Sequence, residues 1–161
     1  MKKILISDFS KVQLFPKDNS YQGGLNKLYD QILSTNKNFN DYFSLNEDLL
    51  DELVKLDIDK YVFTTGKVQS APEIIDRVRT VFKDVFNVPM IGFLKTDPKA
   101  YNILCERLEV KPSQVIFIDD TKDNVEAAKE AGLMAVVYED NNQILMAIKD
   151  WLRYVPTPRP R

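Results

Sequence analysis

Short apolar segments alternate with longer amphipathic segments along most of this chain, and this alternation constrains the fold more than any other feature of the sequence. Between the apolar segments, apolar residues recur at three- and four-residue steps, as on one face of a helix. Apolar runs of strand length occupy residues 3–7, 61–63, 115–118 and 134–138. The pattern predicts an α/β fold with a parallel sheet whose strands are joined by right-handed crossovers.

Helices are predicted where the apolar periodicity and the capping residues agree. Asp97 is a suitable N-cap, Pro98 fits the first helical position, and Gly132 fits a helix C-terminus. Residues 36–40 are polar and predicted to form a loop, and residues 153–161, rich in proline and arginine, are predicted to form a frayed tail. The helical segments are 21–34, 46–56, 72–82, 97–108, 124–131 and 142–152.

Composition excludes several classes of chemistry. The chain has 161 residues, which suits one domain, and its net charge of −2 creates no basic field for nucleic acid or anionic lipid. The chain contains no histidine, which excludes Ser-His-Asp and Cys-His catalysis and histidine zinc sites. Cys105 is the single cysteine, and its helical spacing predicts a core residue. No apolar run reaches membrane length, and the N-terminal run is too short for a signal peptide, so we expect a cytoplasmic protein.

Polar residues that could carry chemistry stand where the predicted strands end. Alone, each has an ordinary explanation as a cap, a turn residue or a surface lysine. Together they suggest a site, because ligands of parallel sheets bind beyond the carboxyl ends of the strands. The residues are Asp8, Thr64, Thr65, Lys95, Asp119 and Asp120.

The order Asp, Thr, Lys, Asp-Asp closely resembles the haloacid dehalogenase-like hydrolase superfamily. Its four motifs correspond to residues 4–10, 61–66, 94–98 and 115–120, the last followed by a helix that reaches Gly132. The resemblance spans about residues 3–140 and implies a Rossmann-like α/β/α fold of three layers around a central parallel sheet. It divides the chain into a core over residues 1–152, with a small helical cap inserted at about 15–45, and the tail.

The resemblance implies phosphoryl transfer assisted by Mg²⁺. Asp8 would be the nucleophile that forms an aspartyl-phosphate. Asp8, the backbone carbonyl of Ser10 and Asp120 would hold Mg²⁺, with Asp119 close by. These are the oxygen ligands that Mg²⁺ prefers.

The resemblance also implies the groups that bind the phosphate. The Thr65 hydroxyl and the Gly66 N–H would bind its oxygens, and Thr64 is the less favoured partner. Lys95 would neutralise the charge that develops on the transferred group. Asn124 stands where the family often has an acid that orients this lysine.

Ser10 departs from the family pattern. The phosphatases have an aspartate there, which protonates the leaving group and then activates water. A serine hydroxyl does not titrate near neutral pH, so a contribution of about 10²–10⁴-fold in rate is at stake. Haloacid dehalogenases also lack this aspartate, because their halide leaving group needs no proton.

Three functions therefore remain open. A Mg²⁺-dependent phosphatase, either slowed by Ser10 or rescued by another group, is favoured. A catalytically degenerate protein that binds a phosphate ligand or a protein partner comes next, followed by a dehalogenase or other hydrolase. Because the cap is small, we expect a large phosphorylated substrate or a second subunit that completes the site. Nucleic-acid binding through Arg153, Arg159 and Arg161 is weighed and disfavoured against a solvated tail.

Overall fold

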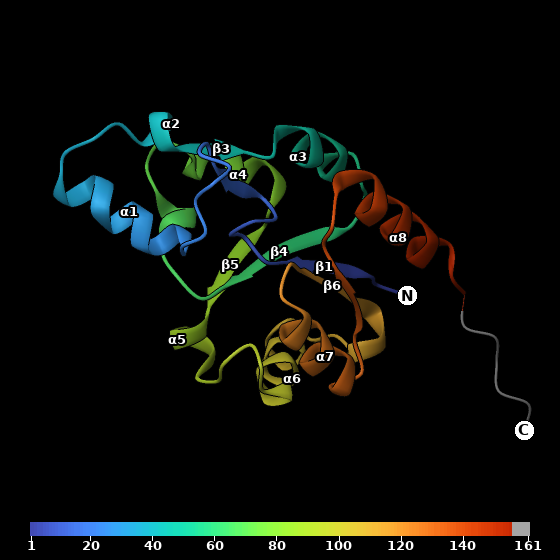
Figure 1. Ribbon diagram of the computed structural model, residues 1–161. Coiled ribbons are helices and arrows are strands. Elements are labelled where there is room, and N and C mark those ends of the chain that lie inside the picture. The colour runs from blue at the N-terminus through green and yellow to red at the C-terminus, as the bar shows by residue number, and fades with distance from the viewer. Residues whose placement is uncertain (156–161) are drawn as a thin grey trace, which may run out of the picture.

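The computed structural model describes residues 1–155 and is built on a five-stranded sheet in the order β5-β4-β1-β6-β7 (Figure 1). Each neighbouring pair in this sheet is parallel. Helices cover both faces, so the predicted α/β fold with three layers is confirmed. The strands are β1 Ile4–Ser7, β4 Asp59–Thr64, β5 Asp84–Asn87, β6 Val115–Asp119 and β7 Met134–Val137.

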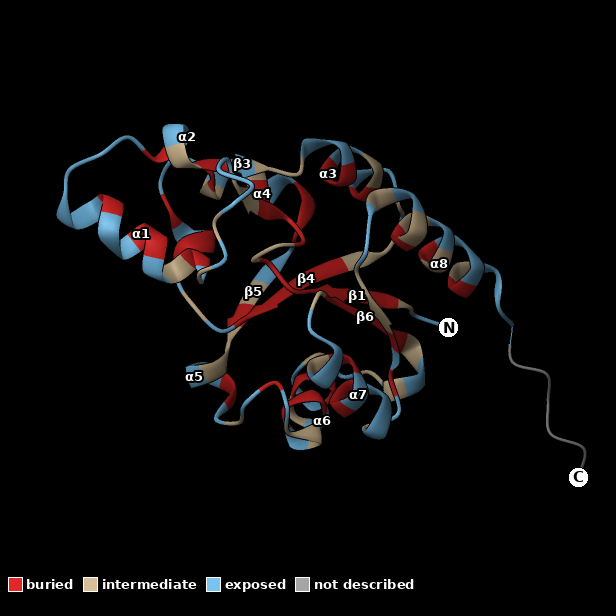
Figure 2. Ribbon diagram, in the orientation of Figure 1, coloured by how far each residue is buried: buried red, intermediate tan, exposed pale blue. Residues whose placement is uncertain are grey.

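The two faces of the sheet bury separate apolar clusters, because side chains alternate along each strand. Leu5, Val62 and Ile116 belong to the cluster beneath α3, α4 and α8. Ile6 and Phe117 belong to the cluster beneath α5, α6 and α7. The central strands β1, β4 and β6 are buried along most of their length (Figure 2), which explains why apolar residues dominate their sequences. These helices are α3 Glu47–Val54, α4 Ile75–Val81, α5 Val88–Ile91, α6 Pro98–Arg107, α7 Lys122–Glu130 and α8 Asn141–Arg153.

An insertion separates the first strand from the rest of the core. The short strands β2 Leu14–Pro16 and β3 Phe43–Leu45 pair in antiparallel fashion. Between them lie α1 Leu25–Ser34 and the single-turn α2 Phe39–Tyr42, which occupy the upper left of Figure 1. The insertion therefore places two helices on the side of the molecule where β1 and β4 end.

Several local predictions are confirmed. Asp97 caps α6 by accepting a hydrogen bond from the Lys99 amide, with Pro98 in the first turn. Gly132 follows α7 with φ of 96°, a conformation that favours glycine. Cys105 is buried, and burial raises the pKa of its thiol to about 11, as expected of an inert core cysteine.

Two other local predictions are wrong. The edge strand β5 was not expected, because only Phe86 within it is buried and the apolar signal is correspondingly weak. Residues 36–40 are not all loop, since Asn38 caps α2 by accepting from the Asn40 amide. The predicted tail lies mostly at residues 156–161, outside the described part, while Arg153 ends α8.

No helix within residues 1–155 is long and apolar enough to cross a membrane.

Candidate functional site

Asp8 lies immediately beyond β1, in the middle of the sheet. Its amide donates to the Ile118 carbonyl at 2.7 Å, which holds the backbone against β6. Its carboxylate oxygen Oδ1 accepts from the Phe9 amide at 2.8 Å and from Lys95 Nζ at 2.7 Å. The residue is only 7% exposed, so these contacts take the place of water.

Lys95 joins the ends of two strands. It is 3% exposed, and its Nζ donates both to Asp8 and, at 2.9 Å, to Asp119 Oδ2. The Phe63 and Phe117 rings lie 5.4 Å and 5.8 Å from this nitrogen. Burial lowers the pKa of Lys95, but the two carboxylates raise it more, so the net direction is upward. The lysine is therefore a fixed positive charge between two aspartates.

Asp119 is fully buried and has a partner for each carboxylate oxygen. Oδ1 accepts from the Thr121 amide at 2.8 Å, and Oδ2 accepts from Asn124 Nδ2 at 3.1 Å as well as from Lys95. Asn124 thus contacts Asp119, and Asp119 contacts the lysine. The hydroxyl of Tyr101 donates to the Lys95 carbonyl at 2.7 Å and so holds the backbone of the lysine.

Three carboxylates at this edge could share a cation. Asp8, Asp119 and Asp120 each offer an oxygen, and the three oxygens lie within 4.8 Å of one another. Burial raises the pKa of Asp8 to about 8, Lys95 opposes this shift, and Asp119 adds to it. Burial also raises the pKa of Asp120. A hard divalent cation such as Mg²⁺ fits an all-oxygen donor set. It would offset the repulsion between the neighbouring carboxylates.

The three predicted phosphate-binding residues lie at the end of β4 and directly after it, and they differ from one another in burial. Thr64 is fully buried, and its hydroxyl has no hydrogen-bond partner among residues 1–155. Thr65 is exposed and Gly66 partly exposed. The side chain of Asn26, from α1, lies directly against Gly66. The structure thus brings Asp8, Asp119 and Lys95 into direct contact, whereas Thr64 ends β4 and Thr65 and Gly66 lie in the loop after it.

Ser10 lies two residues after Asp8 and forms an isolated bridge with Leu14. Its hydroxyl oxygen is buried and has no partner within the described chain. Lys11, which follows, has φ of 62°, the left-handed region that side chains other than glycine seldom adopt. The turn after Asp8 is therefore a tight one that contributes no carboxylate at position 10.

Two glutamines near the site were not predicted. Gln13 Nε2 donates to Ser7 Oγ at 3.0 Å, and Gln69 Nε2 donates to the Gly66 carbonyl at 2.6 Å. Both side chains are almost completely buried, and the Oε1 atom of each has no partner within residues 1–155. A glutamine inside the apolar run around position 13 could have been noticed, whereas nothing in the sequence distinguishes Gln69.

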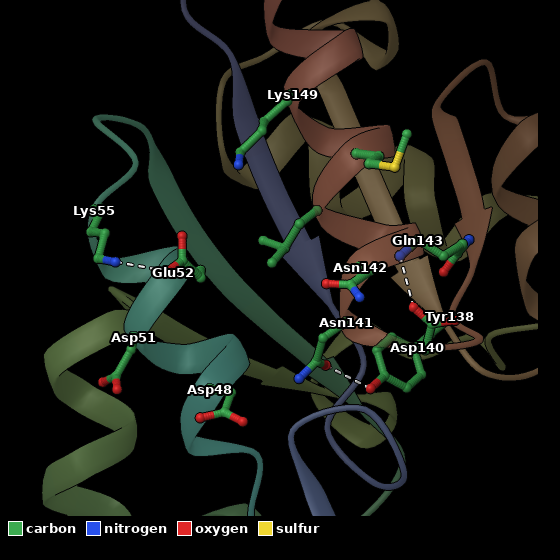
Figure 3. A pocket seen from close by; sticks show the side chains of 12 residues that line it. Asp48, Asp51, Glu52, Lys55, Tyr138, Asp140, Asn141, Asn142, Gln143 and Lys149 are labelled. Atoms are coloured by element: carbon green, nitrogen blue, oxygen red, sulfur yellow. Dashed lines mark hydrogen bonds and ion pairs between the residues drawn. The ribbon is translucent and has the colours of Figure 1, made fainter.

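A groove of about 1180 Å³ runs between α3 and α8, on the sheet face opposite the Phe63 and Phe117 rings (Figure 3). Tyr138 and Asn141 lie at one end, where the tyrosine hydroxyl donates to Asn141 Oδ1 at 2.8 Å. Its charged lining residues are Asp48, Asp51, Glu52, Lys55, Asp140 and Lys149, so none of the clustered carboxylates lines it. The candidate chemistry lies at the strand ends and not in this groove.

Comparison with known proteins identifies the family of the chain. The family model of haloacid dehalogenase-like hydrolases matches residues 22–132, a range that contains Lys95, Asp119 and Asp120 but not Asp8. A phosphorylated carbohydrates phosphatase of Thermotoga maritima is 36% identical over 87 residues, which are 51% of this chain and 39% of that protein. Bifunctional epoxide hydrolase 2 of Mus musculus is 29% identical over 59 residues, 37% of this chain. The chain spans only 11% of the mouse protein.

A solved structure supports the fold independently. A HAD family enzyme of Bacteroides thetaiotaomicron, in complex with magnesium and inorganic phosphate, superposes with a TM-score of 0.62. The match covers 86% of this chain and 95% of that one at 16% sequence identity. At this identity the similarity shows the shared fold.

Proposed function

The chain belongs to the haloacid dehalogenase-like hydrolases, and on that basis we propose that it is a Mg²⁺-dependent phosphatase with Asp8 as its nucleophile. One observation carries the proposal. Asp8, Asp119 and Asp120 cluster at the carboxyl ends of β1 and β6, where the buried ammonium group of Lys95 contacts Asp8 and Asp119. Phosphatases among the relatives, including the Thermotoga protein, support this reaction class.

The contacts of Asp8 define its part in the reaction. Lys95 and the Phe9 amide both bind Oδ1, which leaves Oδ2 as the oxygen that attacks phosphorus. The new bond joins Oδ2 to phosphorus as the bond to the leaving alkoxide breaks, and water then hydrolyses the aspartyl-phosphate. Mg²⁺ held by Asp8, Asp120 and the Ser10 carbonyl, with Asp119 beside it, would screen the repulsion between carboxylate and phosphate.

The loop after β4 supplies the remaining phosphate contacts in this proposal. The buried Thr64 hydroxyl has no partner within the described chain, and phosphate oxygens would be its acceptors. The amides of Thr65 and Gly66 follow it in the same loop. This arrangement makes Thr64 a stronger candidate than the exposed Thr65 side chain, which reverses the order expected from the sequence.

Ser10 determines which esters react. Its hydroxyl cannot protonate an alkoxide leaving group near neutral pH. Aryl and acyl phosphates need little protonation, so we expect them to be hydrolysed faster than alkyl phosphates. The two-helix insertion is small, so the proposed substrate is large, or a second copy of the chain covers the site.

The test is a screen of phosphate esters with and without Mg²⁺, comparing the wild type with Asp8→Asn. Removal of a nucleophile typically lowers kcat by at least about 10³-fold. We expect aryl phosphates to give Mg²⁺-dependent turnover that the variant loses. Equal rates in the two proteins for every ester would overturn the proposal.

A second function is favoured by one feature, the absence of a titratable side chain at Ser10. A protein that binds a phosphate ligand without turning it over would keep the lysine and the acids but would not need that group. This candidate predicts Mg²⁺-dependent binding of inorganic phosphate together with no turnover of any ester.

A further inference from the structure

The loop that follows β4 is held by a residue from the insertion. Asn26 lies in the first turn of α1, and its Oδ1 accepts hydrogen bonds from the amides of Lys67 at 2.9 Å and Val68 at 3.0 Å. These amides begin the short 3₁₀ helix Val68–Ser70, whose own N-cap residue, Lys67, provides no side-chain cap. Asn26 therefore caps this helix from 41 positions away in the sequence.

Gly66 leaves room for the Asn26 side chain because it has no Cβ atom. A Cβ atom at this position would overlap the Asn26 carboxamide, so only glycine leaves room for the contact. The Gly66 carbonyl is in turn bound by Gln69 Nε2 at 2.6 Å. The loop is thus fixed on one side by α1 and on the other by its own glutamine.

These contacts leave a particular set of donors free. Within residues 1–155, the Thr65 and Gly66 amides have no hydrogen-bond partner, and neither does the buried Thr64 hydroxyl. Three adjacent unpaired donors at the carboxyl end of a central strand suit the oxygens of an anion. Their arrangement depends on the backbone that Asn26 holds.

We propose that Asn26 is a positioning residue, which orders the loop 64–68 so that its free donors bind phosphate. The inference rests on the proposed phosphatase function and extends it, because it makes phosphate affinity depend on the docking of α1. Lys67 and Asp30 form an ion pair at 2.6 Å across the same junction, but both side chains are more than half exposed. Such a pair contributes little, so Asn26 is the principal polar link.

The first test separates the contact from its consequence. Hydrogen exchange of the Lys67 and Val68 amides reports the contact itself, and calorimetric titration with inorganic phosphate in Mg²⁺ reports anion binding. Asn26→Ala should accelerate exchange of both amides and raise the Kd for phosphate, each about tenfold, through loss of two hydrogen bonds. Asn26→Asp keeps the acceptor and should keep the exchange protection.

Asn38→Ala is the matched control. Asn38 caps α2 in the same insertion by accepting from the Asn40 amide, and within residues 1–155 its side chain forms no hydrogen bond with the loop. This variant should leave the exchange of Lys67 and Val68 and the affinity for phosphate unchanged. If it weakens phosphate binding as much as Asn26→Ala, general loosening of the insertion explains the effect and the proposal is wrong.

A double-mutant cycle tests the steric part. Gly66→Ala should displace Asn26 and reproduce the exchange and affinity changes of Asn26→Ala. In the Asn26→Ala background, the same substitution should add little, because the obstructing side chain is gone. Additive effects of the two substitutions would contradict the proposed contact.

The outcomes distinguish this proposal from the proposed function. Unchanged exchange in Asn26→Ala, or faster exchange with unchanged phosphate affinity, overturns the role of Asn26 and leaves the phosphatase proposal intact. If wild type binds no phosphate and turns over no ester, the phosphatase proposal fails and the positioning role fails with it.

Discussion

The candidate site has two halves, the carboxylates with Lys95 and the loop after β4, and they differ in how far their polar groups have partners within the protein. In the carboxylate half, Lys95 contacts both Asp8 and Asp119 within 2.9 Å, and both oxygens of Asp119 have partners. In the loop half, which follows β4, the Thr64 hydroxyl and the Gln69 Oε1 atom are buried and have no partner among residues 1–155. The polar groups of the carboxylate half thus have hydrogen-bond partners within the protein, whereas the loop half retains donors and acceptors without one.

The difference indicates which half responds to a ligand. An unpaired buried polar group destabilises the folded protein, so proteins seldom keep one without a reason. In the carboxylate half, burial instead opposes the charged form of Asp8 and raises its pKa to about 8, and Lys95 offsets this effect only in part. We therefore expect a cation to complete the carboxylate half and an anion to complete the loop half.

Ser10 belongs to neither half, and an acid introduced there should have the largest effect. Ser10→Asp places a carboxyl group two residues after Asp8, with the backbone carbonyl still available to a metal. We expect kcat/KM for alkyl phosphates to rise by about 10²-fold and that for aryl phosphates to rise less, because good leaving groups need less protonation. The measurement compares both ester classes in the wild type and in Ser10→Asp.

Each protein is measured beside its own Asp8→Asn version. If both are indistinguishable from these controls, catalysis is excluded and the phosphate-binding function is favoured. If the wild type already hydrolyses alkyl phosphates rapidly, another group delivers the proton and this account of Ser10 is wrong.

Completion of the carboxylate half by Mg²⁺ should stabilise the protein in a pH-dependent way. The pKa of Asp8 is raised from 3.8 to about 8, so the folded state binds a proton that the unfolded state releases near pH 4. Without metal, this group makes stability fall as pH rises from about 4 to 8. Mg²⁺ replaces the proton, so its stabilisation should be larger at pH 8 than at pH 5.

Thermal unfolding checks this prediction. At ten times its Kd, Mg²⁺ should stabilise the protein by about 1.4 kcal/mol, a rise in Tm of several degrees. Asp120→Ala is the comparison, because it removes one carboxylate of the cluster. An equal Mg²⁺ effect in both proteins would place the metal elsewhere, and a larger effect at pH 5 would contradict the raised pKa.

The carboxylate half was more predictable from the sequence than the loop half. Asp8 and Asp119 each end an apolar run, and parallel strands bring such residues to one edge whatever the loops do. Asn26, Gln13 and Gln69 act through loop and insertion contacts, which leave no periodic signature. For the same reason the buried β1, β4 and β6 were predicted, whereas the half-exposed edge strand β5 was missed.

The smallest effect should come from the Thr64 hydroxyl, and it should have opposite signs in the free and liganded proteins. Valine has nearly the same shape as threonine, so Thr64→Val removes an unpaired buried hydroxyl without leaving a cavity. We expect the free protein to gain up to about 1 kcal/mol in stability, with a Tm higher by 2–4 °C, in rough terms. Affinity for inorganic phosphate should fall, because the anion loses a donor. Thr65→Val, at an exposed position, is the control and should change neither quantity. A destabilised Thr64→Val with unchanged phosphate affinity would show that the hydroxyl already has a partner in the folded protein, and the loop half would then be as complete as the carboxylate half.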